Sequence, residues 1–369
     1  MQNKTGRSGP NAINLFSQTV AIRLRTAAAV LFKGQKQRAR KEARQAFDIP
    51  AISADEVAEA RLFFPMEKFF IYGHARSGTT LLTRLVRVHP QVYCNYQAHF
   101  FSRPPLLQSL VTDAEVTEWL ARRSNRWNRG RDLSPVVLRA TADFIMERDA
   151  RKAGKTITGD KSPNSLLDGD AVRLLVRVYP DARLIFIIRD GRDAAISHRF
   201  QAFIDNPQSL SRADLQIRQD FTHNPEPFLN SQRSIFSEKV LRQAALGWVK
   251  NVQETNQAGL ELLPETYQTL RYEDLLKVPH REMSQVWSFL GADLAAPGLF
   301  EALDEELQQN PDADWQQQKA GDIAGAMQLY PTVQKGKSGS WQNILTSQDK
   351  RLFWEIAGET LTAWGYAEG

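Results

Sequence analysis

The sequence has a single cysteine, Cys94, and no apolar run near the roughly 20 residues that span a bilayer. One thiol excludes an intramolecular disulfide and any metal site built from cysteines, so nothing points to an oxidising compartment. The longest apolar run near the start, Ala27 to Phe32, lacks the charged, apolar and small-residue order of a secretory signal. These absences predict a cytoplasmic protein without a signal peptide or a transmembrane helix.

The sequence also has no net positive charge outside the first 50 residues. Those residues carry ten Lys and Arg against two Asp and Glu, which leaves 37 against 40 in the remainder, although the whole chain has a net charge of +5. A slightly acidic body is a poor match for a nucleic-acid backbone, whereas a local anion pocket inside it is compatible with this balance. We therefore expect no nucleic-acid partner.

Residues 1–50 are predicted to form a basic N-terminal extension, with apolar residues at helical spacing between positions 12 and 45. A basic amphipathic helix of this kind could lie on an anionic membrane surface. A solvated or self-packed helix would show the same stripe, and an organellar transit peptide is a weaker third interpretation. Peripheral membrane contact through residues 12–45 is therefore one of three interpretations.

Beyond the extension, short β-rich runs alternate with helical patterns, which is typical of a parallel sheet flanked by helices. The predicted strands are Lys68–Tyr72, Thr156–Thr158, Leu184–Ile188 and Tyr267–Leu270, and the helical stretches that follow them are Thr79–Val88, Asp168–Tyr179, Asp193–Phe203 and Glu282–Leu290. The pattern predicts one α/β domain over residues 60–369, a P-loop-like three-layer fold with functional residues at the carboxyl ends of the strands. Two polar segments, about 204–234 and 304–340, are predicted to be irregular lids.

The first strand runs into a glycine-rich loop, Gly73 to Thr80, with the Gly, four residues, Gly spacing of a phosphate-binding loop. Glycines let successive backbone N–H groups point at an anion, and the next helix adds its positive N-terminal end. Thr79 occupies the position of the lysine that nucleoside triphosphatases use, and Arg76 supplies a positive charge from within the loop instead. A purely structural turn is the alternative interpretation.

A second buried strand ends in a charged turn at Arg189, and Ser197 follows eight residues later on the predicted helix. The two can converge if the helix folds back over the turn. Two anion sites at neighbouring strand ends suit a nucleotide with phosphate at both ends. One such nucleotide is 3′-phosphoadenylyl sulfate (PAPS), which carries a 5′ phosphosulfate and a 3′ phosphate.

On these motifs the chain resembles the PAPS-dependent sulfotransferase superfamily, and most closely the tyrosylprotein sulfotransferases and their bacterial relatives. The resemblance implies that the loop holds the 5′ phosphosulfate, that Arg189 and Ser197 hold the 3′ phosphate, and that Tyr272 lies near the adenine. It also implies that a late closing segment around Lys335 and Gly336 covers the 3′ phosphate. The implied PAPS-binding residues are Arg76, Ser77, Gly78, Thr79, Thr80, Arg189, Ser197, Tyr272, Lys335 and Gly336.

Sulfuryl transfer is an in-line displacement at sulfur, and charge that builds on the oxygens must meet fixed positive donors. Arg76 and Lys161 are the candidates, because Lys161 in Gly159-Asp160-Lys161-Ser162-Pro163 resembles the family lysine that stabilises the transition state. A lysine exposed on a turn is the alternative. Since protein cations can do this work, we expect no metal.

The catalytic base is less clear. Tyrosylprotein sulfotransferases use a glutamate about twenty residues after the loop arginine, and Gln97 occupies that position here. An amide cannot accept the proton, so His99, two residues later, is the predicted base. His89, His198 and His223 are weaker candidates, because a histidine more often lies in the core or on the surface.

The sequence therefore predicts a sulfotransferase that moves a sulfuryl group from PAPS to a hydroxyl or amine and releases adenosine 3′,5′-bisphosphate (PAP). A non-catalytic PAPS-binding protein is the first alternative, and a P-loop kinase, which would need the missing lysine, is the second. The acceptor is open between a small molecule, a glycan, a lipid and a protein.

Overall fold

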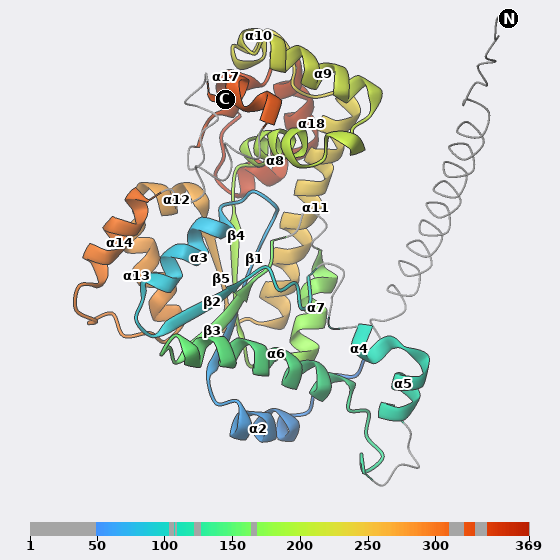
Figure 1. Cartoon of the computed structure of the whole chain (residues 1–369), viewed down its shortest axis with the longest axis vertical. Helices are drawn as coiled ribbons and strands as arrows, with labels where there is room; N and C mark the ends of the chain where they lie inside the picture. The colour runs from blue at the N-terminus through green and yellow to red at the C-terminus, as the bar shows by residue number, and fades with distance from the viewer. Residues whose placement is uncertain are drawn as a thin grey trace, which may run out of the picture. The chain divides into compact units, whose positions relative to one another are not determined.

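Five strands form one parallel sheet in the order β2-β3-β1-β4-β5 (Figure 1). The computed structural model describes residues 49–102, 107, 109–121, 127–163, 168–309, 321–328 and 338–368, and residues 50–369 form one compact unit. The strands are β1 (Glu67–Gly73), β2 (Val92–Tyr96), β3 (Ile157–Lys161), β4 (Arg183–Ile188) and β5 (Tyr267–Arg271). The predicted α/β fold with a central parallel sheet is confirmed.

All neighbouring strands pair in parallel, so their carboxyl ends meet at one edge of the sheet. β1 is the central strand, and Ile71 pairs with Lys161 on one side and with Ile185 on the other. The predicted strand 156–158 extends further than expected. It ends at Lys161, whose side chain is only 1% exposed, so the alternative of a lysine exposed on a turn is wrong.

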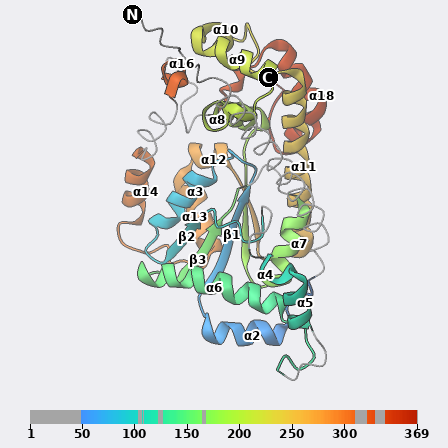
Figure 2. The same cartoon turned by 45° about the vertical axis from the view of Figure 1, so that its right-hand side comes forward.

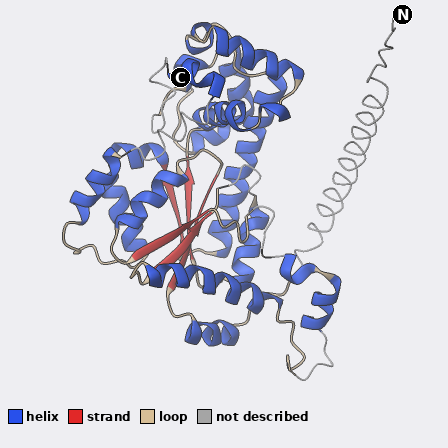
Figure 3. Ribbon diagram, viewed as in Figure 1, coloured by secondary structure: helices blue, strands red, loops and turns tan. Residues whose placement is uncertain are grey.

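Helices cover both faces of the sheet (Figure 3). On one face, Phe69 and Ile71 of β1 pack with Leu82 and Val86 of α3 and with Trp287 of α13. Four helices lie on this side of the sheet, namely α3 (Thr79–Val88), α12 (Tyr272–Lys277), α13 (Pro279–Phe289) and α14 (Leu299–Gln308). The other large helices around the sheet are α2 (Ala54–Phe63), α6 (Ser134–Lys152), α7 (Gly169–Val178) and α11 (Glu238–Leu262). Because helices cover both faces, β1, β3 and β4 are buried along nearly their whole length, which explains why the apolar runs of β1 and β4 read as nearly continuous.

Smaller helices complete the domain. Next to α6 lie α4 (Ser109–Thr112) and α5 (Ala114–Ala121), and α18 (Ser347–Ala363) packs along α11 (Figure 2). The others are α8 (Gly191–Asp205), η2 (Pro207–Ser209), α9 (Arg212–His223), α10 (Glu226–Leu229), η3 (Gly321–Ile323), α16 (Ala324–Gln328) and α17 (Trp341–Ile344). None of the helices in the described part of the chain is long and apolar enough to cross a membrane.

The predicted irregular lid at 204–234 is wrong, because this segment is largely helical. Ser211 caps α9 by accepting a hydrogen bond from the backbone N–H of Asp214, and Arg199 of α8 forms a buried ion pair with Asp214 at 2.6 Å. Phe221 and Phe228 then pack as edge-to-face rings at 5.7 Å. A helix that buries only a narrow apolar stripe reads as polar in sequence, and this concealed the element.

The structure also changes two other predicted boundaries. The prediction of an irregular segment at 304–340 is wrong for its first residues, which belong to α14, and residues 310–320 and 329–337 lie outside the described residues. The domain begins earlier than residue 60, because α2 starts at Ala54 and packs against α6. Residues 1–48 of the basic extension lie outside the described part of the chain.

Candidate active site

The phosphate loop connects β1 to α3 through two backbone conformations of positive φ. Gly78 has φ +87° and precedes the first turn of α3, and Arg76 has φ +74°. A Cβ at Gly78 would also lie 2.1 Å from the ring carbon Cδ2 of Tyr272, so both the conformation and the space require glycine. The loop is therefore curled between the strand and the helix, the kind of geometry in which successive N–H groups can face an anion.

Ser77 is the loop residue that most clearly calls for a ligand. Its side chain is fully buried, and within the described residues its Oγ has no hydrogen-bond partner. A buried hydroxyl left without a partner costs free energy, so such a group in a native protein needs an explanation. An anion with several acceptor oxygens would provide one.

Three cations meet at this edge from three neighbouring elements. The Nε of Arg76 donates to Ser197 Oγ at 3.1 Å, and Nη1 of Arg189 donates to the backbone carbonyl of Arg76 at 3.1 Å. Lys161 Nζ lies 3.4 Å from Thr80 Oγ1, at the start of α3. The predicted convergence of Arg189 and Ser197 on the loop is therefore what the structure shows, and Lys161 joins the same cluster.

Tyr272 lies beside the phosphate loop and Arg189. Its ring lies against Gly78, and the guanidinium carbon of Arg189 is 4.8 Å from the ring centroid. The side chain is 3% exposed, and burial raises the pKa of its hydroxyl, so it stays neutral. The indole N–H of Trp248 holds the backbone of Arg189 by donating to its carbonyl at 3.1 Å. These contacts fix the direction of the Arg189 side chain.

His99 lies in the turn after β2, beside the end of β3. Its backbone N–H donates to Ser162 Oγ at 2.9 Å, and its Nδ1 is 3.1 Å from Ser102 Oγ. Its partner Ser162 directly follows Lys161, the last residue of β3, so His99 lies near the cation cluster. The hydrogen bond to Ser102 orients the ring.

The three other histidines weighed as bases have different surroundings. His89 is fully buried with Nε2 2.9 Å from the Asp293 carbonyl, and burial lowers its pKa. His223 is at the end of α9 with Nδ1 2.8 Å from the Gln219 carbonyl. His198 is exposed on α8 and interacts electrostatically with His74 of the phosphate loop, so it is nearer the cluster than the sequence suggested.

Two buried carboxylates near the cluster had no role in the sequence analysis. Asp193 of α8 accepts hydrogen bonds from the N–H groups of Gly339 at 2.6 Å and Trp341 at 3.0 Å, and burial raises its pKa to about 6. Asp160 of β3 is 1% exposed, and burial raises its pKa to about 6 as well. Both lie close in sequence to a predicted cation at a strand end, since Asp160 precedes Lys161 and Asp193 follows Arg189 by four residues. This proximity is the sequence signal that could have identified them.

Lys335 and Gly336, the predicted closing segment, lie outside the described residues. Described structure resumes at Ser338, and the two hydrogen bonds to Asp193 attach the following residues to the N-terminal turn of α8. That turn also follows directly from Arg189.

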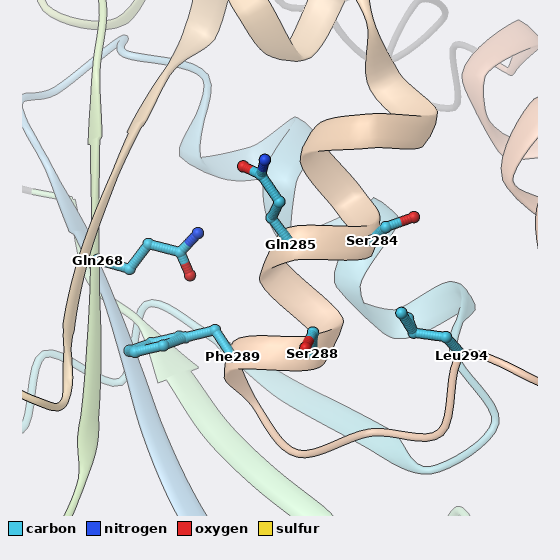
Figure 4. A pocket seen from close by; sticks show the side chains of 6 residues that line it. All are labelled: Gln268, Ser284, Gln285, Ser288, Phe289 and Leu294. Carbon is cyan, nitrogen blue, oxygen red and sulfur yellow. The ribbon is translucent and has the colours of Figure 1, made fainter.

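A pocket of about 510 Å³ lies away from these strand ends, between the amino-terminal half of β5 and α13 (Figure 4). Its lining carries no charged side chain and consists of Gln268, Ser284, Gln285, Ser288, Phe289 and Leu294. It is therefore separate from the cation cluster.

Comparison with known proteins finds one family whose model matches the part of the chain that carries the cluster. A model described as the sulfotransferase family matches residues 68–296, which include all five strand ends. Protein-tyrosine sulfotransferase A of Caenorhabditis elegans is 32% identical over 128 residues, 33% of this chain and 30% of the relative. Protein-tyrosine sulfotransferase of Drosophila melanogaster is 31% identical over 129 residues, 34% of this chain and 24% of the relative. The matched segment thus spans under a third of either relative.

Among solved structures, mouse sulfotransferase SULT7A1 complexed with PAP is similar at a TM-score of 0.42, with 16% identity, and the match covers 84% of this chain and 89% of that one. Retinol dehydratase in a complex with retinol and PAP is similar at 0.43, with 18% identity, over 84% and 86% of the two chains. Because the family model covers more than half of the sequence, the chain belongs to the sulfotransferase family.

Proposed function

We propose that this protein transfers the sulfuryl group of PAPS to a hydroxyl or amine of an acceptor and releases PAP. The observation that carries the proposal is the junction of Arg76, Lys161 and Arg189 around one phosphate loop, through the bonds to Ser197, Thr80 and the Arg76 carbonyl. Fixed cations at a strand edge suit a nucleotide with an anionic group at each end.

The loop and the turn after β4 would bind the two ends of the nucleotide. The 5′ phosphosulfate would accept hydrogen bonds from the loop N–H groups and from the buried Ser77 hydroxyl, which would then gain a partner. The 3′ phosphate would lie at Arg189 and Ser197. Tyr272 would lie beside the adenosine, since its ring contacts both Gly78 of the loop and Arg189.

In the transfer step, the acceptor oxygen or nitrogen forms a bond to sulfur while the bond from sulfur to the bridging oxygen breaks. The electron pair of that bond leaves with PAP. Lys161 and Arg76 would stabilise the charge that builds on the bridging and equatorial oxygens. The acceptor proton would pass to a base, for which His99 in the turn beside β3 is the candidate.

Transfer of label from ³⁵S-PAPS to an extract of candidate acceptors tests the proposal, with and without EDTA. We expect labelled product in both conditions, and a loss of about a thousandfold in Arg76→Ala, because the loop loses its fixed positive donor. Arg173→Ala, which removes an exposed arginine paired with Asp170, is the matched control and should keep full activity. Tight binding of PAP without any transfer would favour a non-catalytic nucleotide-binding protein, and label transfer only without EDTA would point to a metal.

A further inference from the structure

The turn after β2 is held by an arrangement of three hydrogen bonds. Its three consecutive N–H groups, those of Gln97, Ala98 and His99, donate to three consecutive residues of β3 and its end. Gln97 donates to the Lys161 carbonyl at 2.7 Å, Ala98 to Asp160 Oδ1 at 3.0 Å, and His99 to Ser162 Oγ at 2.9 Å. The turn is therefore fixed in register with Lys161.

The backbone of this turn needs such support. Gln97 has φ +56° and His99 has φ +51°, a left-handed conformation that costs a residue with a side chain roughly 1–2 kcal/mol. Positive φ at non-glycine residues persists where the surroundings impose it and is concentrated at functional sites. Here two such residues flank Ala98, whose N–H is bound by a carboxylate.

The two side chains that hold the turn are themselves fixed. Asp160 and Ser162 are each 1% exposed, and the Ser162 hydroxyl donates to the second carboxylate oxygen of Asp160. The backbone N–H of Ser162 donates to the Ile71 carbonyl of β1 at 3.0 Å. Asp160 and Ser162 thus connect the turn to the central strand that carries the phosphate loop.

The strand order places this turn opposite the nucleotide side of the cluster. The residues proposed for the nucleotide follow β1, β4 and β5, whereas the turn follows β2, on the other side of Lys161. In-line displacement requires the attacking atom to approach sulfur from the side opposite the leaving PAP. With the nucleotide along the ends of β1, β4 and β5, as proposed above, the acceptor would enter from the β2 and β3 side, where the turn lies.

We propose that Asp160 and Ser162 are positioning residues, which hold the turn of residues 97–99 and its candidate base His99 beside Lys161 and toward the acceptor. This inference rests on the proposed sulfuryl transfer. It assigns the two side chains no contact with the nucleotide, so their loss should affect the acceptor and not the affinity for PAP.

Asp160→Ala and Ser162→Ala test the inference, with Asp160→Asn and Ser162→Thr as conservative variants that keep an acceptor oxygen for the turn. Asp349→Ala is the matched control, since Asp349 is a buried carboxylate that accepts from the backbone N–H of Thr346 at 3.1 Å, at the start of α18. Amide hydrogen exchange of residues 97–99, the affinity for PAP by calorimetry, and kcat/KM for the acceptor with ³⁵S-PAPS are measured for each.

The alanine variants at 160 and 162 should exchange the turn amides at least tenfold faster and lose about 10- to 100-fold in kcat/KM for the acceptor, with the PAP affinity within about twofold of wild type. Asp160→Asn, Ser162→Thr and Asp349→Ala should stay close to wild type in these three measurements. If Asp160→Ala does not fold, Ser162→Ala decides the result.

Unchanged exchange of the turn amides would overturn the inference, as would faster exchange with unchanged acceptor kinetics. An equal loss of PAP affinity and of acceptor kcat/KM would show a general structural role instead. A wild-type chain that binds PAP but transfers no label would refute the proposed function and the acceptor role together, whereas the exchange data would still show whether Asp160 and Ser162 hold the turn.

Discussion

Both ends of the parallel sheet carry buried cations, but the groups that contact them differ. At the amino end, Lys68 lies 2.8 Å from Glu147 and 3.4 Å from Asp143, and Arg139 forms a two-bonded pair with Asp181 at 2.7 and 2.9 Å. Carboxylates of this kind offset the cost of burying the cation by neutralising it.

At the carboxyl end, the contacts of the cations described above are with a serine hydroxyl, a threonine hydroxyl, a backbone carbonyl and a tyrosine ring. Such groups fix the direction of a side chain, and the buried carboxyl groups that interact electrostatically with Lys161 and Arg189 are those of Asp160 and Asp193. The comparison indicates that the amino end uses charge for stability, whereas under the proposed function the oriented charge at the carboxyl end would bind an anionic ligand.

Exchanging one lysine at each end for methionine gives the largest effects. Lys161→Met should lower kcat by about 100- to 1,000-fold and leave the free energy of unfolding close to wild type, because the lost ammonium acts on the transition state. Lys68→Met should cost about 3–5 kcal/mol of unfolding free energy, because Glu147 and Asp143 both lose the buried ammonium that contacts them. Urea unfolding and label transfer per folded molecule measure the two quantities. Similar losses of both quantities in the two variants would remove the distinction between the ends.

The pH dependence of stability should have opposite signs for two carboxylates, Asp193 at the carboxyl end and Asp181 at the amino end. Burial raises the pKa of Asp193 to about 6 at the carboxyl end. The folded state then binds a proton that the unfolded chain releases near pH 4, so this group's contribution to stability falls by about 3 kcal/mol as the pH rises from 4 to 6. At the amino end, burial would raise the pKa of Asp181, but hydrogen bonds from Arg139 and Arg61 outweigh it and lower the pKa. That contribution is present above pH 4 and is lost as the pH falls further.

Urea unfolding at pH 3 to 7 of wild type, Asp193→Asn and Asp181→Asn measures these contributions. The stability advantage of wild type over Asp193→Asn should shrink between pH 4 and 6, and the advantage over Asp181→Asn should shrink only below pH 4. Parallel curves for the two variants would contradict the assignment of opposite shifts.

The features predicted correctly from sequence are those that neighbouring residues determine. The apolar run Leu184–Ile188 and the glycine-containing turns identify buried strands, and the spacing within Gly73 to Thr80 identifies the loop. The bond between Ala98 and Asp160 joins residues 62 positions apart and depends on β2 lying next to β3, an order that no local pattern specifies. Sequence therefore supplied the cations and left out the carboxylates that hold the backbone around them.

Arg183 begins β4 and Arg189 directly follows it, so these two arginines allow the two ends of the sheet to be compared within a single strand. Arg189→Ala should weaken the affinity for PAP by about 10- to 100-fold, since hydrogen bonds to a charged group contribute about 1.5–3 kcal/mol. Arg183→Ala, at the other end of β4, removes a pair with Glu67 at 3.0 Å and should leave PAP affinity unchanged. Calorimetry with adenosine 5′-phosphosulfate, which lacks the 3′ phosphate, should give the same affinity for wild type and Arg189→Ala. A loss of affinity for both nucleotides would instead place Arg189 at the 5′ phosphosulfate, and the two-ended division of the site would be wrong.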